Sequence, residues 1–275
     1  MPELPEVETI RKTLEKLVLE KEIGEISIHW PKIIKKPDDI EHFKQLLSGE
    51  TIRSIARRGK FLMFYMDDYV LVSHLRMEGK YRVVDVDEPM TKHTHVIFHF
   101  TDGTEMRYLD VRKFGTMHVF PIGTELIEKP LQQLGPDPFE DTYTFDYLYQ
   151  KLQRTARNIK VALLDQTIIA GLGNIYVDEV LFLSQIHPER RANTLSKSEV
   201  QVVFEYAKKV LAQAVAQGGT TIRSYVDGNG EMGMFQQELF VYGQENEACK
   251  NCGDMIIKFK LAGRGTHICA TCQKE

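Results

Sequence analysis

Four cysteines near the end of the chain constrain its fold more strongly than any other feature of the sequence. All four lie within the last 27 of 275 residues, in two C-x-x-C pairs that sixteen residues separate. This spacing is typical of a structural zinc site, in which four thiolates complete a tetrahedral shell and leave no open position for catalysis. Two disulfides or free thiols are the alternatives, and a reducing compartment disfavours disulfides. We predict one structural Zn²⁺, with the ligands Cys249, Cys252, Cys269 and Cys272.

The hydrophobic pattern changes near residue 134. Residues 6–19 have the apolar spacing of a helix, and the segments that follow alternate short apolar runs with turn residues such as DD, EGK and TDG. Regular short strands with tight turns predict an antiparallel β-sandwich or barrel with flanking helices. The two prolines of LGPDPFED, at 134–141, end this region.

Beyond the prolines the pattern is helical. Four segments between residues 144 and 217 have an apolar period of 3.6 residues, and residues 218–236 are glycine-rich and polar, as expected of a mobile loop. We therefore expect an α+β multidomain protein with three parts, residues 1–134, 135–237 and 238–275.

The opening Met-Pro-Glu-Leu-Pro-Glu offers a nucleophile. Removal of Met1 would leave Pro2 with a secondary amine, which can attack an electrophilic carbon and form an iminium intermediate. An α-amine has a pKa of about 8, so a useful fraction is unprotonated at neutral pH. Glu3 could move protons beside it, and the positive end of a helix beginning near Pro5 would disfavour the charged amine. A polar helix start without chemistry is the alternative.

Charge placement favours a nucleic-acid partner more than the charge total does. The net charge of −4 argues weakly against such a partner, but RSIARRGK at 53–60 and KLQRTARNIK at 151–160 each carry four cations and no acid. A solvated surface is the alternative for either run. The acidic N-terminus lacks the apolar region of a signal peptide, and no run of about 18 apolar residues is present. We expect a cytoplasmic monomer with no membrane partner.

Several residues stand where they could contact DNA or a reacting group. GLGN places Asn174 at a helix start, where backbone N–H groups bind phosphate, although a plain N-cap is equally consistent. Lys60 could serve as a second amine or a proton donor, although a surface lysine is the more common case. Met77, Arg112 and Phe114 follow strands and could be wedges inserted into a DNA stack, or ordinary core residues.

Taken together, these motifs resemble those of one family, the bacterial formamidopyrimidine-DNA glycosylases, across nearly the whole chain. The motifs are PELPEVET at the start, RRGK at 57–60, SHLRMEG at 73–79, VRKFG at 111–115, GLGNIY at 171–176, IHPERRA at 186–192, GGTT at 218–221, ELFVYG at 238–243 and the four-cysteine finger. The resemblance implies a base-excision-repair enzyme that removes oxidised purines from double-stranded DNA and cleaves abasic sites by β,δ-elimination. It also implies a catalytic β-sandwich domain, a helix–two-turns–helix DNA-binding domain with a lesion-recognition loop at 218–236, and a zinc-finger hairpin.

The resemblance further implies roles for single residues. Pro2 would be the nucleophile, Glu3 the general acid and base, Lys60 the proton donor linked to β-elimination, and Arg264 the one linked to δ-elimination. Contacts with DNA are expected from His74, Met77, His93, Arg112, Phe114, Lys160, Asn174 and Tyr242. Within this set, Met77, Arg112 and Phe114 would fill the space that the everted base leaves. Candidates for contact with the everted base are Glu78, Thr221, Arg223 and Tyr225.

Two alternatives stay open. The endonuclease VIII enzymes prefer oxidised pyrimidines and share the Pro2-Glu3 start and the finger, but they usually have Gly where this chain has Leu4. Leu4 and the complete trio of void-filling residues favour the purine-directed branch. A zinc-ribbon protein that binds DNA without catalysis would account for the finger and the basic runs without using the Pro2 amine.

Overall fold

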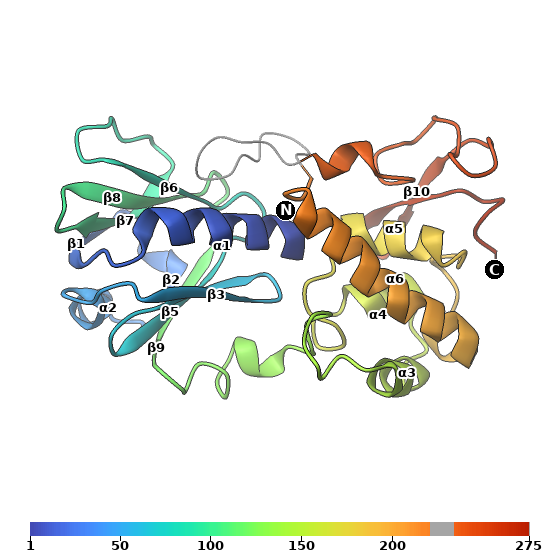
Figure 1. The fold of residues 1–275 in the computed structure, drawn as a ribbon, viewed down its shortest axis with the longest axis horizontal. Coiled ribbons are helices and arrows are strands. Elements are labelled where there is room, and N and C mark those ends of the chain that lie inside the picture. The colour runs from blue at the N-terminus through green and yellow to red at the C-terminus, as the bar shows by residue number, and fades with distance from the viewer. Residues whose placement is uncertain (221–233, 275) are drawn as a thin grey trace. The chain divides into compact units, whose positions relative to one another are not determined.

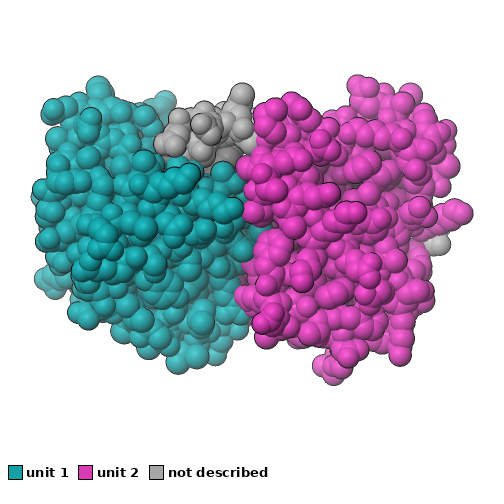
Figure 2. Space-filling model, viewed as in Figure 1, with its two compact units in different colours: residues 1–132, 221–233 teal, residues 133–220, 234–275 magenta. Residues whose placement is uncertain are grey.

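A computed structural model of the chain describes residues 1–220 and 234–274. These residues form two compact units (Figure 2), the N-terminal unit of residues 1–132 and the C-terminal unit of residues 133–220 with 234–274. None of the described helices is both long enough and apolar enough to cross a membrane. Most of the loop expected at 218–236, including Thr221, Arg223 and Tyr225, lies outside the described residues.

Two β-sheets build the N-terminal unit (Figure 1). The antiparallel four-stranded sheet contains, in spatial order, β1 (Ile23–Ile28), β7 (Thr94–Phe100), β8 (Thr104–Leu109) and β6 (Lys80–Asp85). The five-stranded sheet contains β2 (Ile34–Lys36), β9 (Thr116–Pro121), β5 (Tyr69–His74), β4 (Phe61–Tyr65) and β3 (Ser54–Arg58). All neighbouring pairs are antiparallel except β2 and β9.

One apolar core joins both sheets to the helices α1 (Leu4–Val18) and α2 (Ile40–Leu47). Val7, Ile10 and Leu14 recur at the spacing of one helical face and are buried in this core. The sandwich predicted from the alternating pattern is therefore confirmed, together with its first flanking helix. The pattern did not predict α2 or the short strand β2, although Asp39 carries a local signal because its side chain accepts the His42 N–H at the start of α2.

Helices dominate the C-terminal unit, as the apolar period predicts. They are α3 (Phe145–Gln153), α4 (Ile159–Leu164), α5 (Asn174–Leu183) and α6 (Lys197–Ala216). Four short 3₁₀ turns add to the described fold: η1 (Pro31–Ile33), η2 (Leu131–Gln133), η3 (Ala192–Thr194) and η4 (Phe235–Gln237). Residues 175–182 of α5 are all buried, so α5 is the central helix of its unit.

The same unit contains a two-stranded hairpin, β10 (Ile257–Leu261) and β11 (Arg264–Ile268). Ala262 and Gly263 connect the strands, and both have positive φ, +47° and +80°. Positive φ at both central residues is the geometry of a type I′ turn, which glycine adopts without strain and which matches the twist of the paired strands. The turn makes Arg264 the first residue of β11, at the exposed tip of the hairpin.

Candidate active site and nucleic-acid interface

The N-terminal residues are buried and held by the first turn of α1. The Glu3 N–H donates to Glu6 Oε2 at 2.8 Å, and the Glu3 side chain in return accepts from the Glu6 backbone. This reciprocal capping box fixes the backbone of Glu3, and with it the peptide that joins Glu3 to Pro2. Pro2 is buried, and the Glu3 side chain is only 1% exposed. The alternative of a polar helix start predicts that these groups lie in water, whereas the structure buries both.

Lys60 lies in the two-residue turn between β3 and β4, yet it is buried. An ion pair attaches the preceding strand β3 to α1, because Arg57 Nε lies 3.0 Å from Glu8 Oε2. The Arg57 guanidinium also donates to the Gly59 carbonyl at 3.0 Å. The more common expectation from the sequence was a surface lysine, whereas the structure buries Lys60.

His74 ends strand β5 as a buried, neutral imidazole. Burial lowers the pKa of His74 to about 3, and the positive charges of Arg76 and Lys60 act in the same direction. The Arg76 N–H donates to His74 Nδ1 at 2.9 Å, so in the neutral ring the proton resides on Nε2. His74 can therefore donate one hydrogen bond, as a contact with a phosphate oxygen requires.

Tyr108 brings together the two loops that carry the expected void-filling residues. A Cβ at Gly79 would lie 2.3 Å from Tyr108 Oη, and a Cβ at Gly115 would lie 1.7 Å from the same oxygen. Both loops therefore pack directly on this hydroxyl, at positions where only glycine fits. Burial raises the pKa of Tyr108 well above its usual value, so the hydroxyl stays protonated.

Asp110 shapes the second of these loops. Its carboxylate accepts the backbone N–H groups of Arg112 at 2.9 Å, Phe114 at 2.8 Å and Gly115 at 2.9 Å. The Asp110 N–H in turn donates to the carbonyl of His93, just before β7. His93 and the loop at 111–115, both expected to contact DNA, are thus neighbours in the structure.

The expected void-filling residues differ in exposure. Phe114 is 52% exposed and Arg112 is exposed, with the guanidinium carbon 4.9 Å from the centre of the Phe114 ring. The alternative that Phe114 is a core residue is therefore wrong, while Met77 is half-buried. An exposed phenyl ring under a cation is suited to stacking against a base.

Three expected residues of the C-terminal unit lie around β11. The Asn174 amide donates to the Gly265 carbonyl at 2.9 Å, and Arg264 precedes Gly265 with an exposed side chain. The half-buried ring of Tyr242 lies 4.7 Å from the ring of His267. Asn174 and Arg264 are therefore adjacent, whereas the sequence separates them by ninety residues.

Lys160 is placed differently from the other expected DNA contacts. Its side chain is 1% exposed, and Nζ lies 2.6 Å from Oδ1 of Asp178, which is fully buried. The apolar run on either side of Asp178 gave no indication of this pair. The structure therefore places Lys160 in the interior of the C-terminal unit, where its ammonium does not reach solvent.

The four cysteines converge as predicted. Their Sγ atoms all lie within 4.8 Å of one another, with 3.9 Å between Cys249 and Cys272 and 3.4 Å between Cys252 and Cys269. A tetrahedral zinc with bonds of about 2.3 Å separates its sulfur ligands by about 3.8 Å, so the donor set and its spacing fit Zn²⁺. Phe182 of α5 packs with Cys249, Cys269 and Ile256 in one small core.

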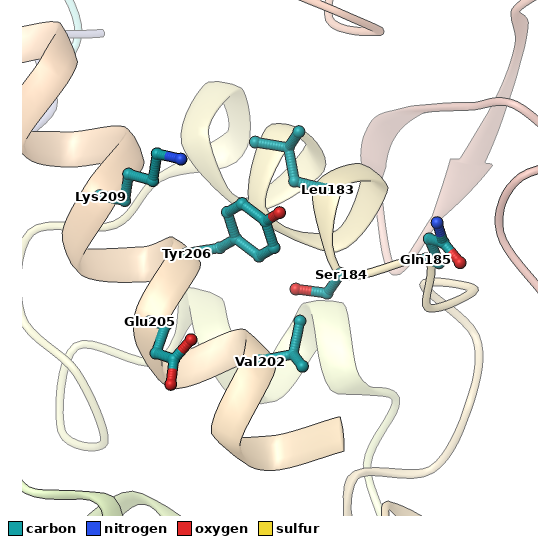
Figure 3. Close-up of a pocket in the computed structure, with 7 residues that line it drawn as sticks. All are labelled: Leu183, Ser184, Gln185, Val202, Glu205, Tyr206 and Lys209. Atoms are coloured by element: carbon teal, nitrogen blue, oxygen red, sulfur yellow. The ribbon is translucent and has the colours of Figure 1, made fainter. Parts of the chain in front are cut away.

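A pocket of about 440 Å³ lies between the end of α5 and α6 (Figure 3). None of its lining residues is a candidate from the sequence; they are Leu183, Ser184, Gln185, Val202, Glu205, Tyr206 and Lys209. Ser184 Oγ is buried and has no hydrogen-bond partner among the described residues. The pocket contains no group that the expected chemistry uses.

Comparison with known proteins identifies the class to which this fold and these residues belong. Three family descriptions match: "Formamidopyrimidine-DNA glycosylase N-terminal domain" over residues 1–117, "Formamidopyrimidine-DNA glycosylase H2TH domain" over residues 134–226, and "Zinc finger found in FPG and IleRS" over residues 246–274. The fold is thus that of a DNA glycosylase with a helix–two-turns–helix domain and a four-cysteine finger.

Individual relatives match over the full length. The formamidopyrimidine-DNA glycosylase of Oceanobacillus iheyensis is 60% identical over 273 residues, which cover 99% of this chain and 98% of that protein. The Bacillus licheniformis enzyme of the same name is 57% identical and covers 100% of both chains. The Lactococcus lactis Fpg solved in complex with abasic-site DNA is 42% identical, with a TM-score of 0.94 and 100% coverage of both chains. The chain belongs to the formamidopyrimidine-DNA glycosylase family.

Proposed function

We propose that this protein is a bifunctional DNA glycosylase and AP lyase that acts on oxidised purines and abasic sites in double-stranded DNA. The activity follows from family membership at 60% identity over the full length. The observation that supports the residue roles is the burial of Pro2 and Glu3 against a capping box that fixes their backbone. After removal of Met1 the same burial would give a fixed, desolvated amine next to a carboxylate, which is the arrangement that imine chemistry at a sugar carbon requires.

Access to the lesion requires eversion of the nucleotide, because the glycosidic carbon is shielded inside a duplex. In this proposal Met77, Arg112 and Phe114 enter the space that the base leaves and offset part of the unstacking cost of a few kcal/mol. The loops that carry them are fixed by Tyr108 and Asp110. A rigid wedge loses little entropy on insertion, so its contacts stabilise the everted state efficiently.

Base excision begins when the Pro2 nitrogen, freed by removal of Met1, attacks C1′ of the damaged nucleotide. The C1′–N bond breaks, its electron pair leaves with the base, and Glu3 supplies the proton that neutralises the leaving group. The Pro2 nitrogen then releases its proton, and the C1′–O4′ bond breaks with its electron pair on O4′, which takes up a proton. The products are a free base and an iminium that joins C1′ of the opened sugar to Pro2.

Strand cleavage uses the same intermediate. The iminium acidifies the C2′ proton, and removal of this proton expels the 3′ phosphate by β-elimination. A second proton loss expels the 5′ phosphate by δ-elimination, and hydrolysis of the imine then frees Pro2. We assign Lys60 to proton transfer in the first elimination and Arg264 to the second. The product is a one-nucleoside gap with phosphate at both ends.

Zinc bound to the four thiolates would keep the finger folded, and the folded finger presents Arg264. In the proposed organisation, residues 1–134 carry the nucleophile, residues 135–237 bind DNA and contain the lesion-recognition loop, and residues 238–275 form the finger. We further propose that the protein acts in the cytoplasm, where thiols stay reduced, and as a monomer.

Borohydride trapping tests the proposal. Duplex DNA with 8-oxoguanine opposite cytosine and a matched duplex with thymine glycol are each incubated with the protein and reduced. An adduct on the first duplex that maps to Pro2 is the expected result. An adduct on the second duplex alone would assign the protein to the pyrimidine-directed branch. DNA binding without an adduct on either duplex would favour a non-catalytic DNA-binding protein.

A further inference from the structure

A buried ion pair connects two helices of the C-terminal unit beneath the hairpin. Lys160 of α4 and Asp178 of α5 approach to 2.6 Å, and their side chains are 1% and 0% exposed. Removing two charges from water costs several kcal/mol per ion, and the mutual attraction of such a pair often no more than offsets this cost. A pair of this kind is therefore weak support for stability, and its other contacts indicate its purpose.

Both members of the pair also hold strand β11. Lys160 Nζ donates to the Gly265 carbonyl at 3.0 Å and to Thr266 Oγ1 at 2.9 Å. Asp178 Oδ2 accepts the His267 N–H at 3.0 Å and lies 3.2 Å from His267 Nδ1. Three consecutive residues of one strand are thus attached to a single ion pair, through bonds that charge strengthens.

The strand held in this way begins with Arg264. The Gly265 carbonyl that accepts from Lys160 also accepts from the Asn174 amide at 2.9 Å. Arg264 is bonded directly to Gly265, and its side chain is exposed at the hairpin tip. The Gly265 carbonyl therefore fixes the backbone from which the Arg264 guanidinium extends, next to Asn174.

We propose that Asp178 is a positioning residue for strand cleavage: with Lys160 it fixes β11 so that Arg264 and Asn174 meet the DNA phosphate beside the lesion together. The inference rests on the proposed function, from which it takes the roles of Arg264 and Asn174. It predicts that Asp178 affects δ-elimination, where Arg264 acts, and leaves imine formation at Pro2 nearly unchanged.

Three variants of the full-length, zinc-loaded protein test this inference: Asp178→Asn, Lys160→Met and the double variant. The side-chain amide that Asp178→Asn introduces would retain an acceptor for the His267 N–H but lose the charge that orients Lys160. The double variant leaves no unpaired buried charge, so it remains folded if a single variant does not. Lys208→Met, at an exposed position of α6, is the matched control.

The substrate is duplex DNA with a preformed abasic site. Borohydride trapping reports imine formation, and a denaturing gel reports the ratio of δ- to β-elimination products. In Asp178→Asn the yield of trapped adduct should stay within about twofold of wild type, while the ratio of δ- to β-elimination products should fall about tenfold or more. A loss of this size is expected when a group that takes part in the reaction is displaced by about 1 Å. The double variant should show the same low ratio with a full zinc content. The control should match wild type.

Three results would overturn the inference: a wild-type product ratio in Asp178→Asn, recovery of that ratio in the double variant, or loss of zinc in all three variants. The second or the third would make the Lys160–Asp178 pair a purely structural one. If wild-type protein forms no adduct at all, the proposed function fails instead. Hydrogen exchange in the DNA-free protein then decides. Positioning by Asp178 requires the His267 amide to exchange about tenfold faster in Asp178→Asn, because a neutral amide oxygen accepts more weakly than a carboxylate, and an unchanged rate rejects it.

Discussion

Substitution of Gly115 by alanine tests whether the loop at 111–115 must lie where the structure places it. The added Cβ would stand 1.7 Å from Tyr108 Oη, whereas real Cβ contacts essentially never fall below 3.0 Å, so one side must move by at least the difference, 1.3 Å. Tyr108 has no room to retreat, because it is fully buried, its ring lies 5.2 Å from the ring of Tyr81, and its hydroxyl faces Gly79. The loop that carries Arg112 and Phe114 must therefore move.

The magnitudes follow from this displacement. Overpacking of a well-packed site costs about 1–3 kcal/mol, so the free energy of unfolding should fall by about that amount. A positioning error near 1 Å can cost about 100-fold in rate, so excision from duplex DNA should slow by about 10- to 100-fold. Single-turnover excision of 8-oxoguanine measures the second effect, and urea unfolding of the DNA-free protein measures the first.

Two further variants make the test specific. Gly24→Ala is the matched control, because its Cβ would meet its nearest neighbours at 3.5 and 3.6 Å, which is ordinary contact. In the pair Gly115→Ala with Tyr108→Phe the nearest atom becomes Cζ at 2.6 Å, so the required shift falls to 0.4 Å and part of the rate should return. Excision by Gly115→Ala at the wild-type rate, or no recovery in the pair, would refute the reasoning.

Three other outcomes are expected. Pro2→Gly or Glu3→Gln should abolish base excision but leave the affinity for lesion DNA unchanged. Single-turnover assays measure excision and binding isotherms measure affinity, and excision at the normal rate by either variant would show that the assigned role is wrong. The variant Cys249→Ser should lose its zinc and bind DNA more weakly. A zinc content and a salt-dependent DNA affinity that both equal those of wild type would contradict the predicted zinc site. Stability of the DNA-free protein should fall as pH drops from 6.5 towards 3, because unfolded His74 binds a proton in that window and the buried ring does not. His74→Asn should flatten that slope in urea melts, and an equal slope would count against a buried neutral imidazole.

The fold was predictable wherever a local pattern carried it. The apolar face that includes Val7, Ile10 and Leu14 predicted α1, and the alternation of short apolar runs with turns predicted the sandwich. Cysteine spacing predicted the metal site, because ligand geometry restricts both spacing and number. Strand β2 was missed because it has three residues and only one of them is apolar. Helix α2 was missed although Ile40, Phe43 and Leu47 have helical spacing, because its eight residues form only about two turns.

The buried residues that hold the candidate site in place were not predictable from the sequence. Asp178 and Glu179 lie within an apolar helical stretch, and nothing in their neighbours along the chain reveals partners far away in sequence. Glu179 accepts three N–H groups from residues 240–242, and burial raises the pKa of its carboxyl while these bonds act against the rise. Tyr108 likewise acquires its importance only when two loops meet on its hydroxyl. The roles of Pro2, Lys60 and Arg264 stay predictions that the proposed experiments test.

Buried charge also resolves the conflict between a net charge of −4 and a DNA partner. Among the described residues, nine carboxylates are buried, whereas the buried cations are only Lys60, Arg107 and Lys160. Leaving these twelve charges out of the formal total of −4 adds nine and subtracts three, which gives +2 for the remainder of the chain. Several of the buried acids, such as Asp110 and Asp178, accept backbone N–H groups and fix the segments that carry the cations. A phosphate backbone interacts mainly with the charge that stays in solvent, so acids used inside the fold reduce its attraction far less than their number implies.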